Sequence, residues 1–309
     1  MHIISLFKMT IRGKRKMVRA IALMVSLLTL ELIVIFYCME YICTKKVKID
    51  ESTLEKTLMK KRKYWGSGSA LNEGNEFSFH RTLLNQRNEL SLLLNVARQT
   101  IGQLECSAKT KGEVANSGGW CEEDSGPDSS QHATDTEIVK YLADFFKDMR
   151  VASFGDGPGI YKNYFDGTGL LKVYDAYDGA PYSPRSTTGR VDFLDLSTPQ
   201  YGLPIYDWVL SLEVAEHIPE KYQDVFLSNI VRHAKTGVIL SWAEPGQDGY
   251  HHVNNRDLSF VVGAMETLGF ERNVSESKLL QSHCTLSWLA KNTNVYVRRE
   301  DHPINEYDA

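Results

Sequence analysis

The chain has little excess of charge and few cysteines. Its 309 residues carry a formal net charge of only −4. This balance gives no basic footprint for a nucleic-acid-binding surface, so we expect no nucleic-acid partner. There are five cysteines, and no group of histidines and cysteines has zinc-ligand spacing, so the sequence predicts no metal site. With 24% charged residues, the composition is that of an ordinary globular protein long enough for one or two domains.

The N-terminus combines basic charge with a long apolar run. Residues 1–19 contain six basic residues and no acidic one. Residues 20–39 are apolar apart from Glu31 and a few hydroxyl groups, and about 20 such residues span a bilayer as a helix. We predict a basic cytoplasmic tail at residues 1–19 and a transmembrane signal-anchor at residues 20–42, with the rest of the chain translocated.

This arrangement predicts a single-pass type II membrane protein, held by one transmembrane helix in the endomembrane system (Golgi or ER) or the plasma membrane. The alternative is a cleaved signal peptide, whose apolar core is usually about 7–15 residues and ends in small residues. The run here is longer, and no obvious Ala-x-Ala site follows it.

Residues 43–106 are predicted to form a helical stem. Within residues 79–104, apolar side chains recur every seven residues, at Leu83, Leu90, Ala97 and Leu104. This spacing is typical of a short coiled coil and would allow a dimer through the stem. A single amphipathic helix packed on the main domain explains the same pattern equally well.

A polar segment separates the stem from the main domain. Residues 107–134 are rich in Gly, Ser, Asp, Glu and Lys and are predicted to be a flexible linker. Cys106 and Cys121 flank part of this segment and could pair in a lumenal compartment. Thr134 or Asp135 can cap the helix that begins the main domain, residues 135–309.

Strands and helices alternate from Val151 onward, which predicts a parallel sheet with helices on both faces. The strands are expected near residues 151–154, 172–177, 190–193, 206–211, 236–241, 284–289 and 293–298. The first strand runs into a Gly-x-Gly-x-Gly turn at Gly155, Gly157 and Gly159. Such a turn lets the backbone approach a ligand closely where a strand meets a helix.

Three acidic segments follow this turn. Asp175 and Asp178 lie at the second strand, Asp195 follows the third, and the fourth leads into Glu-Val-Ala-Glu-His-Ile-Pro at residues 213–219. The four segments, in this order, resemble the class I S-adenosylmethionine-dependent methyltransferases. The resemblance implies a Rossmann-like α/β fold: a mostly parallel seven-stranded sheet whose last two strands form an antiparallel edge pair, preceded here by the transmembrane helix and stem. It also implies S-adenosylmethionine as the cofactor.

The resemblance assigns a set of residues to the cofactor. The glycine turn, with Asp156 inside it, would wrap the amino-acid half, and the following helix N-terminus would favour its carboxylate. Asp178 would bind both ribose hydroxyls, with Asp175 as the alternative. Asp195 would hold the adenine amino group, or else cap the turn at Ser197. The full cofactor set is Gly155, Asp156, Gly157, Gly159, Asp175, Asp178, Asp195 and Glu213.

The loops after the fourth and fifth strands are expected to bind the methyl acceptor. Glu216 and His217 are the catalytic candidates, since a histidine can take a proton from an oxygen or nitrogen nucleophile; alternatively, they only orient the loop. His252, Asn254 and Arg256 resemble a signature found in part of the family, and Arg256 could hold an anionic group. The alternative is that this loop only closes over the cofactor.

Methyl transfer from a sulfonium needs mainly alignment and exclusion of water, so the sequence identifies the cofactor better than the acceptor. No Asn-Pro-Pro-aromatic motif is present, which argues against nucleobase amines and leaves a small polar acceptor.

A catalytically inactive relative acting as a scaffold at the membrane is the alternative, favoured by Ser153 where most relatives have an acid. An NAD-dependent Rossmann enzyme is less consistent with the fourth strand. The sequon at Asn273 favours a lumenal domain.

Overall fold

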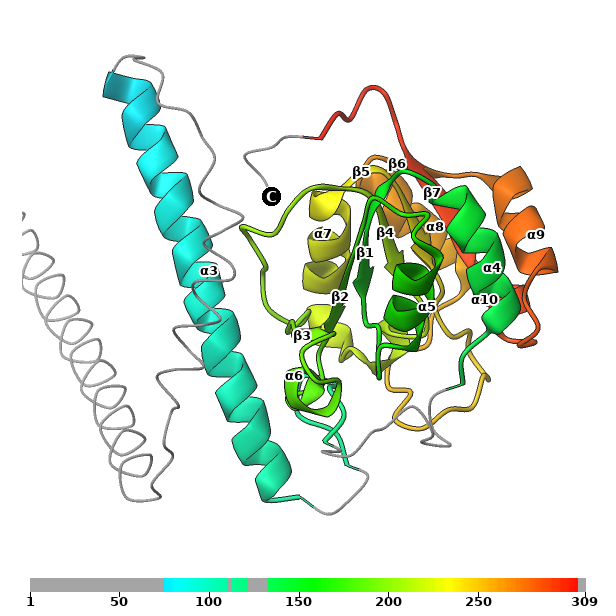
Figure 1. Ribbon diagram of the computed structural model, residues 1–309, viewed down its shortest axis with the longest axis horizontal. Helices are drawn as coiled ribbons and strands as arrows, with labels where there is room; N and C mark the ends of the chain where they lie inside the picture. Colours follow the sequence, from blue (N-terminus) through cyan, green and yellow to red (C-terminus); the bar gives the residue numbers. More distant parts are fainter. Residues whose placement is uncertain (1–74, 110–112, 122–132, 305–309) are drawn as a thin grey trace, which may run out of the picture. The chain divides into compact units, whose positions relative to one another are not determined.

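The computed structural model describes residues 75–109, 113–121 and 133–304 (Figure 1). All described residues belong to one compact unit of the chain. The predicted basic tail and signal-anchor lie outside the described residues. Within residues 75–109, 113–121 and 133–304, no helix is both long enough and apolar enough to cross a bilayer.

A seven-stranded sheet forms the centre of the main domain, in the order β3-β2-β1-β4-β5-β7-β6. Neighbours among β1 to β5 pair in parallel, whereas β7 is antiparallel to both β5 and β6. This topology confirms the predicted Rossmann-like α/β fold, a mostly parallel seven-stranded sheet with an antiparallel edge pair. The strands are β1 Arg150–Phe154, β2 Val173–Asp178, β3 Asp192–Phe193, β4 Tyr206–Ser211, β5 Ala234–Leu240, β6 Phe270–Arg272 and β7 Asn294–Arg298.

The sheet is covered by helices on both faces, as the sequence predicts (Figure 1). Successive residues of a strand point to opposite faces, so Val151 packs with α4 and α5 while Ala152 packs with α7 and α8. Both faces are therefore apolar along the central strands. The covering helices are α4 Thr136–Phe145, α5 Ile160–Thr168, α7 Gln223–His233, α8 Leu258–Thr267 and α9 Val274–Ser282; α6 Ser183–Ser186 and α10 Leu289–Asn292 are single turns.

The antiparallel edge pair is present, but one of its strands is not where the sequence predicted. Residues 284–288 form no strand, and α10 begins at Leu289. The backbone N–H groups of Thr285 and Leu286 donate to the carboxylate of Asp135 instead of a ladder. The partner of β7 is the three-residue strand β6, which follows α8.

Asp135 joins two distant segments of the domain. One carboxylate oxygen accepts the N–H groups of Glu137 and Ile138, which confirms the predicted cap of α4. The other accepts those of Thr285 and Leu286, at 2.6 and 2.8 Å. Burial acts to raise the pKa of Asp135, but these backbone donors outweigh it and hold the pKa below its usual value of 3.8.

We expect Asp135→Asn to lower the free energy of unfolding by about 2 kcal/mol, because an amide NH2 group cannot accept the N–H groups that one oxygen now serves. Since the folded-state pKa is depressed, the wild-type advantage should be complete near neutral pH and shrink as the pH falls below about 4. Urea denaturation at several pH values measures both effects. Asp144→Asn, on the exposed side of α4, is the control and should change little.

Helix α3 (Asn75–Ser107) covers the helical part predicted near residues 79–104 and packs on the main domain through one face, while residues 43–74 of the predicted stem lie outside the described residues. The buried side chain of Asn95 donates to the Phe193 carbonyl and accepts from the Asp195 N–H. The predicted heptad positions lie elsewhere on the helix, and Leu83 and Leu90 are 46% and 65% exposed. Among the described residues, α3 is therefore an amphipathic helix packed on its own domain.

Candidate functional site

A cavity of about 350 Å³ opens at the carboxyl ends of the central strands. The strand order reverses between β1 and β4, and open α/β sheets bind ligands at such a switch point. The cavity wall comes from the loops after β1, β2, β4 and β5. Its lining includes Gly155, Asp156, Gly157, Asp178, Asp195, Glu213, His217 and His252.

The glycine turn forms the floor of one end of the cavity. Gly155, Gly157 and Gly159 have φ values of +103°, +58° and +78°, a region that favours glycine. The N–H groups of Gly155 and Asp156 both donate to the Tyr177 carbonyl, which fixes the turn against β2. Gly159 is the residue that precedes α5, so the N-terminus of that helix faces the same end of the cavity.

Asp178 lies at the tip of β2 and lines the cavity, whereas Asp175 does not. The carboxylate of Asp178 accepts the N–H groups of Gly157 and Ala180, at 2.8 and 2.7 Å, and so holds the turn to the strand. Asp175 lies mid-strand and accepts from the Tyr206 hydroxyl. The assignment of Asp175 to the cofactor is therefore corrected, because its carboxylate is bound to the Tyr206 hydroxyl and is not part of the cavity wall.

We expect Asp178→Ala to weaken S-adenosylmethionine binding about tenfold, since the ribose hydroxyls would lose a charged acceptor. Asp175→Asn is the matched control: it keeps an acceptor for Tyr206 and should leave the affinity unchanged. Isothermal calorimetry on both variants measures the difference. Equal losses in the two variants would contradict the choice of Asp178.

Two further acids of the cofactor set are already engaged by protein groups. Asp156 accepts from the Tyr174 hydroxyl and the Lys162 N–H, and burial raises its pKa to about 6. Asp195 pairs with Arg98 of α3 at 2.5 Å and accepts from both the N–H and the hydroxyl of Ser197. Asp195 thus caps the turn at Ser197, which was the alternative interpretation, while still bordering the cavity.

Glu213 begins the loop after β4 in a left-handed conformation, with φ of +55°. Its carboxylate accepts from Ser241, Gln247 and Asn292 at 2.8, 3.0 and 2.9 Å. These three donors follow β5 or precede β7, so Glu213 ties the ends of neighbouring strands together beside the cavity. Such positive φ values in a non-glycine residue are held by surrounding contacts and cluster at functional sites.

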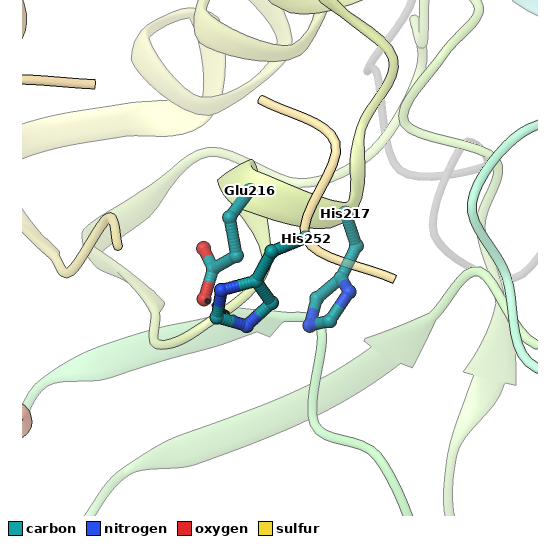
Figure 2. A group of neighbouring side chains, drawn as sticks. All are labelled: Glu216, His217 and His252. Carbon is teal, nitrogen blue, oxygen red and sulfur yellow. Dashed lines mark ion pairs between the residues drawn. The ribbon is translucent and has the colours of Figure 1, made fainter. Parts of the chain in front are cut away.

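Glu216, His217 and His252 lie side by side, as Figure 2 shows. The rings of His217 and His252 are 5.1 Å apart and both border the cavity. Glu216 is completely buried behind them, and burial together with the charge of Glu213 raises its pKa well above the usual value. The structure therefore brings together the loops after β4 and β5, as the sequence predicts for the acceptor end.

Asn254 and Arg256 do not join this group. Arg256 points away from the cavity, donates to Gln223, forms an ion pair with Glu220 at 2.5 Å, and lies over the Phe260 ring. Asn254 is buried, and its backbone binds Glu216 and the Trp242 indole. The substrate assignments of both residues are corrected, because the chain turns back toward α7 after His252.

Residues 117–120 line the cavity, although the sequence predicted a flexible linker over residues 107–134. A β-carbon at Gly118 would overlap the His217 carbonyl, and one at Gly119 would overlap the Gly179 carbonyl. The Trp120 ring lies 6.1 Å from that of His217. This segment therefore closes the cavity over the loops after β2 and β4.

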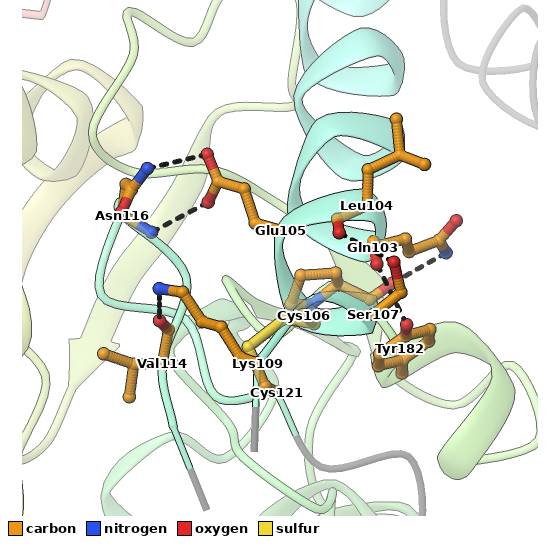
Figure 3. Close-up of a disulfide and its surroundings, with 11 residues drawn as sticks. Gln103, Leu104, Glu105, Cys106, Ser107, Lys109, Val114, Asn116, Cys121 and Tyr182 are labelled. Carbon is orange, nitrogen blue, oxygen red and sulfur yellow. Dashed lines mark hydrogen bonds between the residues drawn. A yellow bond between two sulfur atoms is a disulfide. The ribbon is translucent and has the colours of Figure 1, made fainter. Parts of the chain in front are cut away.

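A disulfide between Cys106 and Cys121 joins this segment to the end of α3, which confirms the predicted pairing (Figure 3). Glu105 accepts from both the N–H and the side-chain amide of Asn116, which adds a second attachment. The two cysteines and the Gly-Gly-Trp sequence at residues 118–120 were the available signals, because glycines next to an aromatic residue permit close backbone packing.

No protein-family model matches the chain, and no curated protein matches it. Several solved methyltransferase structures align with about half of it. They include the magnesium protoporphyrin IX methyltransferase of Synechocystis PCC 6803 with bound S-adenosylmethionine (15% identity, 52% of this chain and 77% of that chain, TM-score 0.39). A second is the N-methyltransferase NodS of Bradyrhizobium japonicum (10% identity, 58% of this chain and 95% of that chain, TM-score 0.41). A third is the sugar N-methyltransferase KedS8 of Streptoalloteichus (11% identity, 53% of this chain and 88% of that chain, TM-score 0.44). Similarity at this level does not identify a substrate.

Proposed function

We propose that the protein is an S-adenosylmethionine-dependent methyltransferase that acts on an oxygen or nitrogen of a small polar acceptor. One observation carries the proposal: a single cavity has the glycine turn and Asp178 at one end and the His217–His252 pair at the other. The first end supplies a glycine backbone that a ligand can approach closely, a helix N-terminus and a strand-tip carboxylate, which suit an amino-acid carboxylate and a ribose.

The second end suits the methyl acceptor. Methyl transfer is an in-line displacement, so the protein must hold the acceptor opposite the departing sulfur and exclude water. His217 and His252 present polar groups there, while Trp120 and Tyr250, whose ring centroids are 5.4 Å apart, also line the cavity. A small polar molecule fits this combination of aromatic walls and a few polar groups.

The experiment that tests the proposal is transfer of a labelled methyl group. The full-length chain, purified in detergent, is incubated with methyl-labelled S-adenosylmethionine and a small-molecule extract. We expect labelled product that depends on the protein and is lost with Asp178→Ala at low cofactor concentration. Cofactor binding without any transfer would favour the inactive relative, and preferential binding of NAD would favour the third alternative.

We also propose that residues 20–42 anchor the protein and that the methyltransferase domain is lumenal. Two observations on the main domain support a lumenal site: the Cys106–Cys121 disulfide, which persists in oxidising compartments, and the sequon at Asn273. We expect the full-length protein to resist carbonate extraction and to shift in size on endoglycosidase treatment, with Asn273→Gln removing the shift. Recovery of a shortened secreted form would indicate a cleaved signal peptide instead.

We propose that two copies of the protein pair through the exposed apolar face of α3. This face carries Leu83, Leu90, Leu94 and Ile101, whose exposed fractions are between 42% and 65%. Pairing with a second copy would bury these side chains in a coiled-coil seam. Light scattering of the detergent-solubilised protein, compared with a Leu90→Lys variant, distinguishes a dimer from a monomer.

A further inference from the structure

Three potential metal ligands meet beside the cavity. Glu216, His217 and His252 each offer one ligand atom, and these atoms all lie within 4.8 Å of one another. Two of them come from the loop after β4 and one from the loop after β5, so the fold brings them together across 35 residues of chain. Figure 2 shows the Glu216 carboxylate beside the His252 ring, with the His217 ring alongside.

Both imidazole rings are oriented by backbone carbonyls. The Nδ1 atom of His217 lies 3.2 Å from the His251 carbonyl oxygen, and that of His252 lies 3.3 Å from the Gln247 carbonyl oxygen. A carbonyl only accepts, so Nδ1 of each neutral ring carries the proton and Nε2 carries the lone pair. Histidine ligands of metals are held in this way, with the second ring nitrogen donating to a carbonyl or carboxylate.

Glu216 supplies the second observation. Its side chain is 0% exposed, and no side chain donates to either carboxylate oxygen; only the backbone N–H groups of Glu216 and Ala243 lie close enough to favour the charged form. A buried carboxylate without a side-chain donor costs several kcal/mol, whereas a bound cation would compensate the charge. Its Oε1 atom lies 3.9 Å from Nε2 of His252. That separation is too long for a hydrogen bond and about 0.5 Å longer than the distance between two ligands of a tetrahedral ion, so binding of an ion would draw the two side chains slightly together.

We infer that Glu216, His217 and His252 bind a divalent first-row transition-metal ion, of which Zn²⁺ and Co²⁺ are representative. Two imidazole nitrogens with one carboxylate favour such an ion over Mg²⁺ or Ca²⁺, which prefer all-oxygen ligand sets. Three protein ligands leave at least one coordination position open, as in catalytic zinc sites. Because His217 and His252 border the cavity, the open position faces the acceptor end. The sequence predicted no metal site here because the three ligands do not follow zinc-ligand spacing.

If the protein is the proposed methyltransferase, an ion at this site favours an acceptor with a hydroxyl group. A hydroxyl group bound to the ion would lose its proton more readily and attack the methyl carbon. The new O–CH3 bond forms as the S–CH3 bond breaks, the electron pair stays on sulfur, and the hydroxyl proton passes to solvent. No oxidant or reductant is needed. With His217 as a ligand, its role is to hold the ion and not to act as the base.

The test measures metal binding without cofactor or acceptor. The full-length protein is stripped with a chelator and titrated by calorimetry with Zn²⁺ and, separately, with Mg²⁺; Co²⁺ reports its ligands by visible absorption. We expect one site that binds Zn²⁺ at least a hundredfold more tightly than Mg²⁺ and gives a Co²⁺ spectrum with nitrogen ligands. Glu216→Gln and His252→Ala should each weaken Zn²⁺ binding at that site at least a hundredfold, whereas His283→Ala, on an imidazole stacked against Tyr141, should not.

Gly249→Ala is a second variant that alters no ligand. A β-carbon at Gly249 would overlap the His252 ring at Nε2, so it should displace that ligand and weaken Zn²⁺ binding at least tenfold. Absence of a Zn²⁺ site, or Zn²⁺ binding unchanged in Glu216→Gln and His252→Ala, would overturn the inference. Methyl transfer by metal-stripped protein would overturn the acceptor step alone. Loss of the proposed cofactor function would instead appear as failure to bind S-adenosylmethionine while Zn²⁺ still binds.

Discussion

Gly155→Ala is expected to reduce S-adenosylmethionine affinity at least a hundredfold. Gly155 has φ of +103°, which an alanine tolerates poorly, and its added β-carbon would overlap the Val214 side chain. The turn would have to move away from Tyr177, whose carbonyl accepts from both Gly155 and Asp156. Because the cofactor would lie against this backbone, a shift of about 1 Å removes several contacts at once. Calorimetry at equal protein concentration measures the loss.

Gly167→Ala is the matched control for this variant. Gly167 lies in α5, has ordinary helical φ, and a β-carbon there would meet nothing within 4 Å. Alanine also favours a helix more than glycine does, so this variant should be as stable as the parent or more so and should bind the cofactor normally. Wild-type affinity in Gly155→Ala would show that the turn does not contact the cofactor.

Breaking the Cys106–Cys121 disulfide should affect both stability and binding. The bridge closes a loop with a sequence separation of 15, and a crosslink over about 15 residues is worth about 3 kcal/mol. Replacing both cysteines with serine should lower the free energy of unfolding by about that amount. It should also weaken cofactor binding several-fold, because residues 117–120 form part of the cavity wall. Denaturant titration and calorimetry measure the two effects.

Cys284→Ser provides the comparison, since Cys284 is a free cysteine and does not line the cavity. It should leave cofactor affinity unchanged. Reduction of the wild-type protein with a thiol should reproduce the double-serine variant and be reversed on reoxidation. Undiminished cofactor affinity after reduction would show that residues 113–121 are not needed to form the site.

Most of the sheet could be predicted from the sequence because the parallel strands are locally apolar. Val151 to Phe154 and Trp208 to Leu210 bury both faces and appear as continuous hydrophobic runs. Strand β6 could not be predicted, because three residues give no periodicity and its pairing depends on β7. The apolar segment near Leu286 does not form a strand, because its backbone N–H groups donate to the carboxylate of Asp135, which is distant in the sequence.

Some residues of the candidate site could likewise be predicted from the sequence, and others could not. The glycine turn and Asp178 could be predicted, since each follows a strand directly and the carboxyl ends of parallel strands meet at one edge. Arg256 could not be placed, because its position depends on Glu220, just before α7, and on Gln223, the first residue of α7. The role of residues 113–121 was hidden because their structure comes from a disulfide and from contacts with loops about 60 to 100 residues away.

The central claim is that this cavity binds S-adenosylmethionine, and calorimetric titration of the full-length protein tests it most directly. We predict one binding site for S-adenosylmethionine, displaced by S-adenosylhomocysteine and lost in Gly155→Ala but not in Gly167→Ala. NAD should give no heat of binding under the same conditions. Absence of S-adenosylmethionine binding by the folded wild-type protein, or equal binding of NAD, would contradict the account.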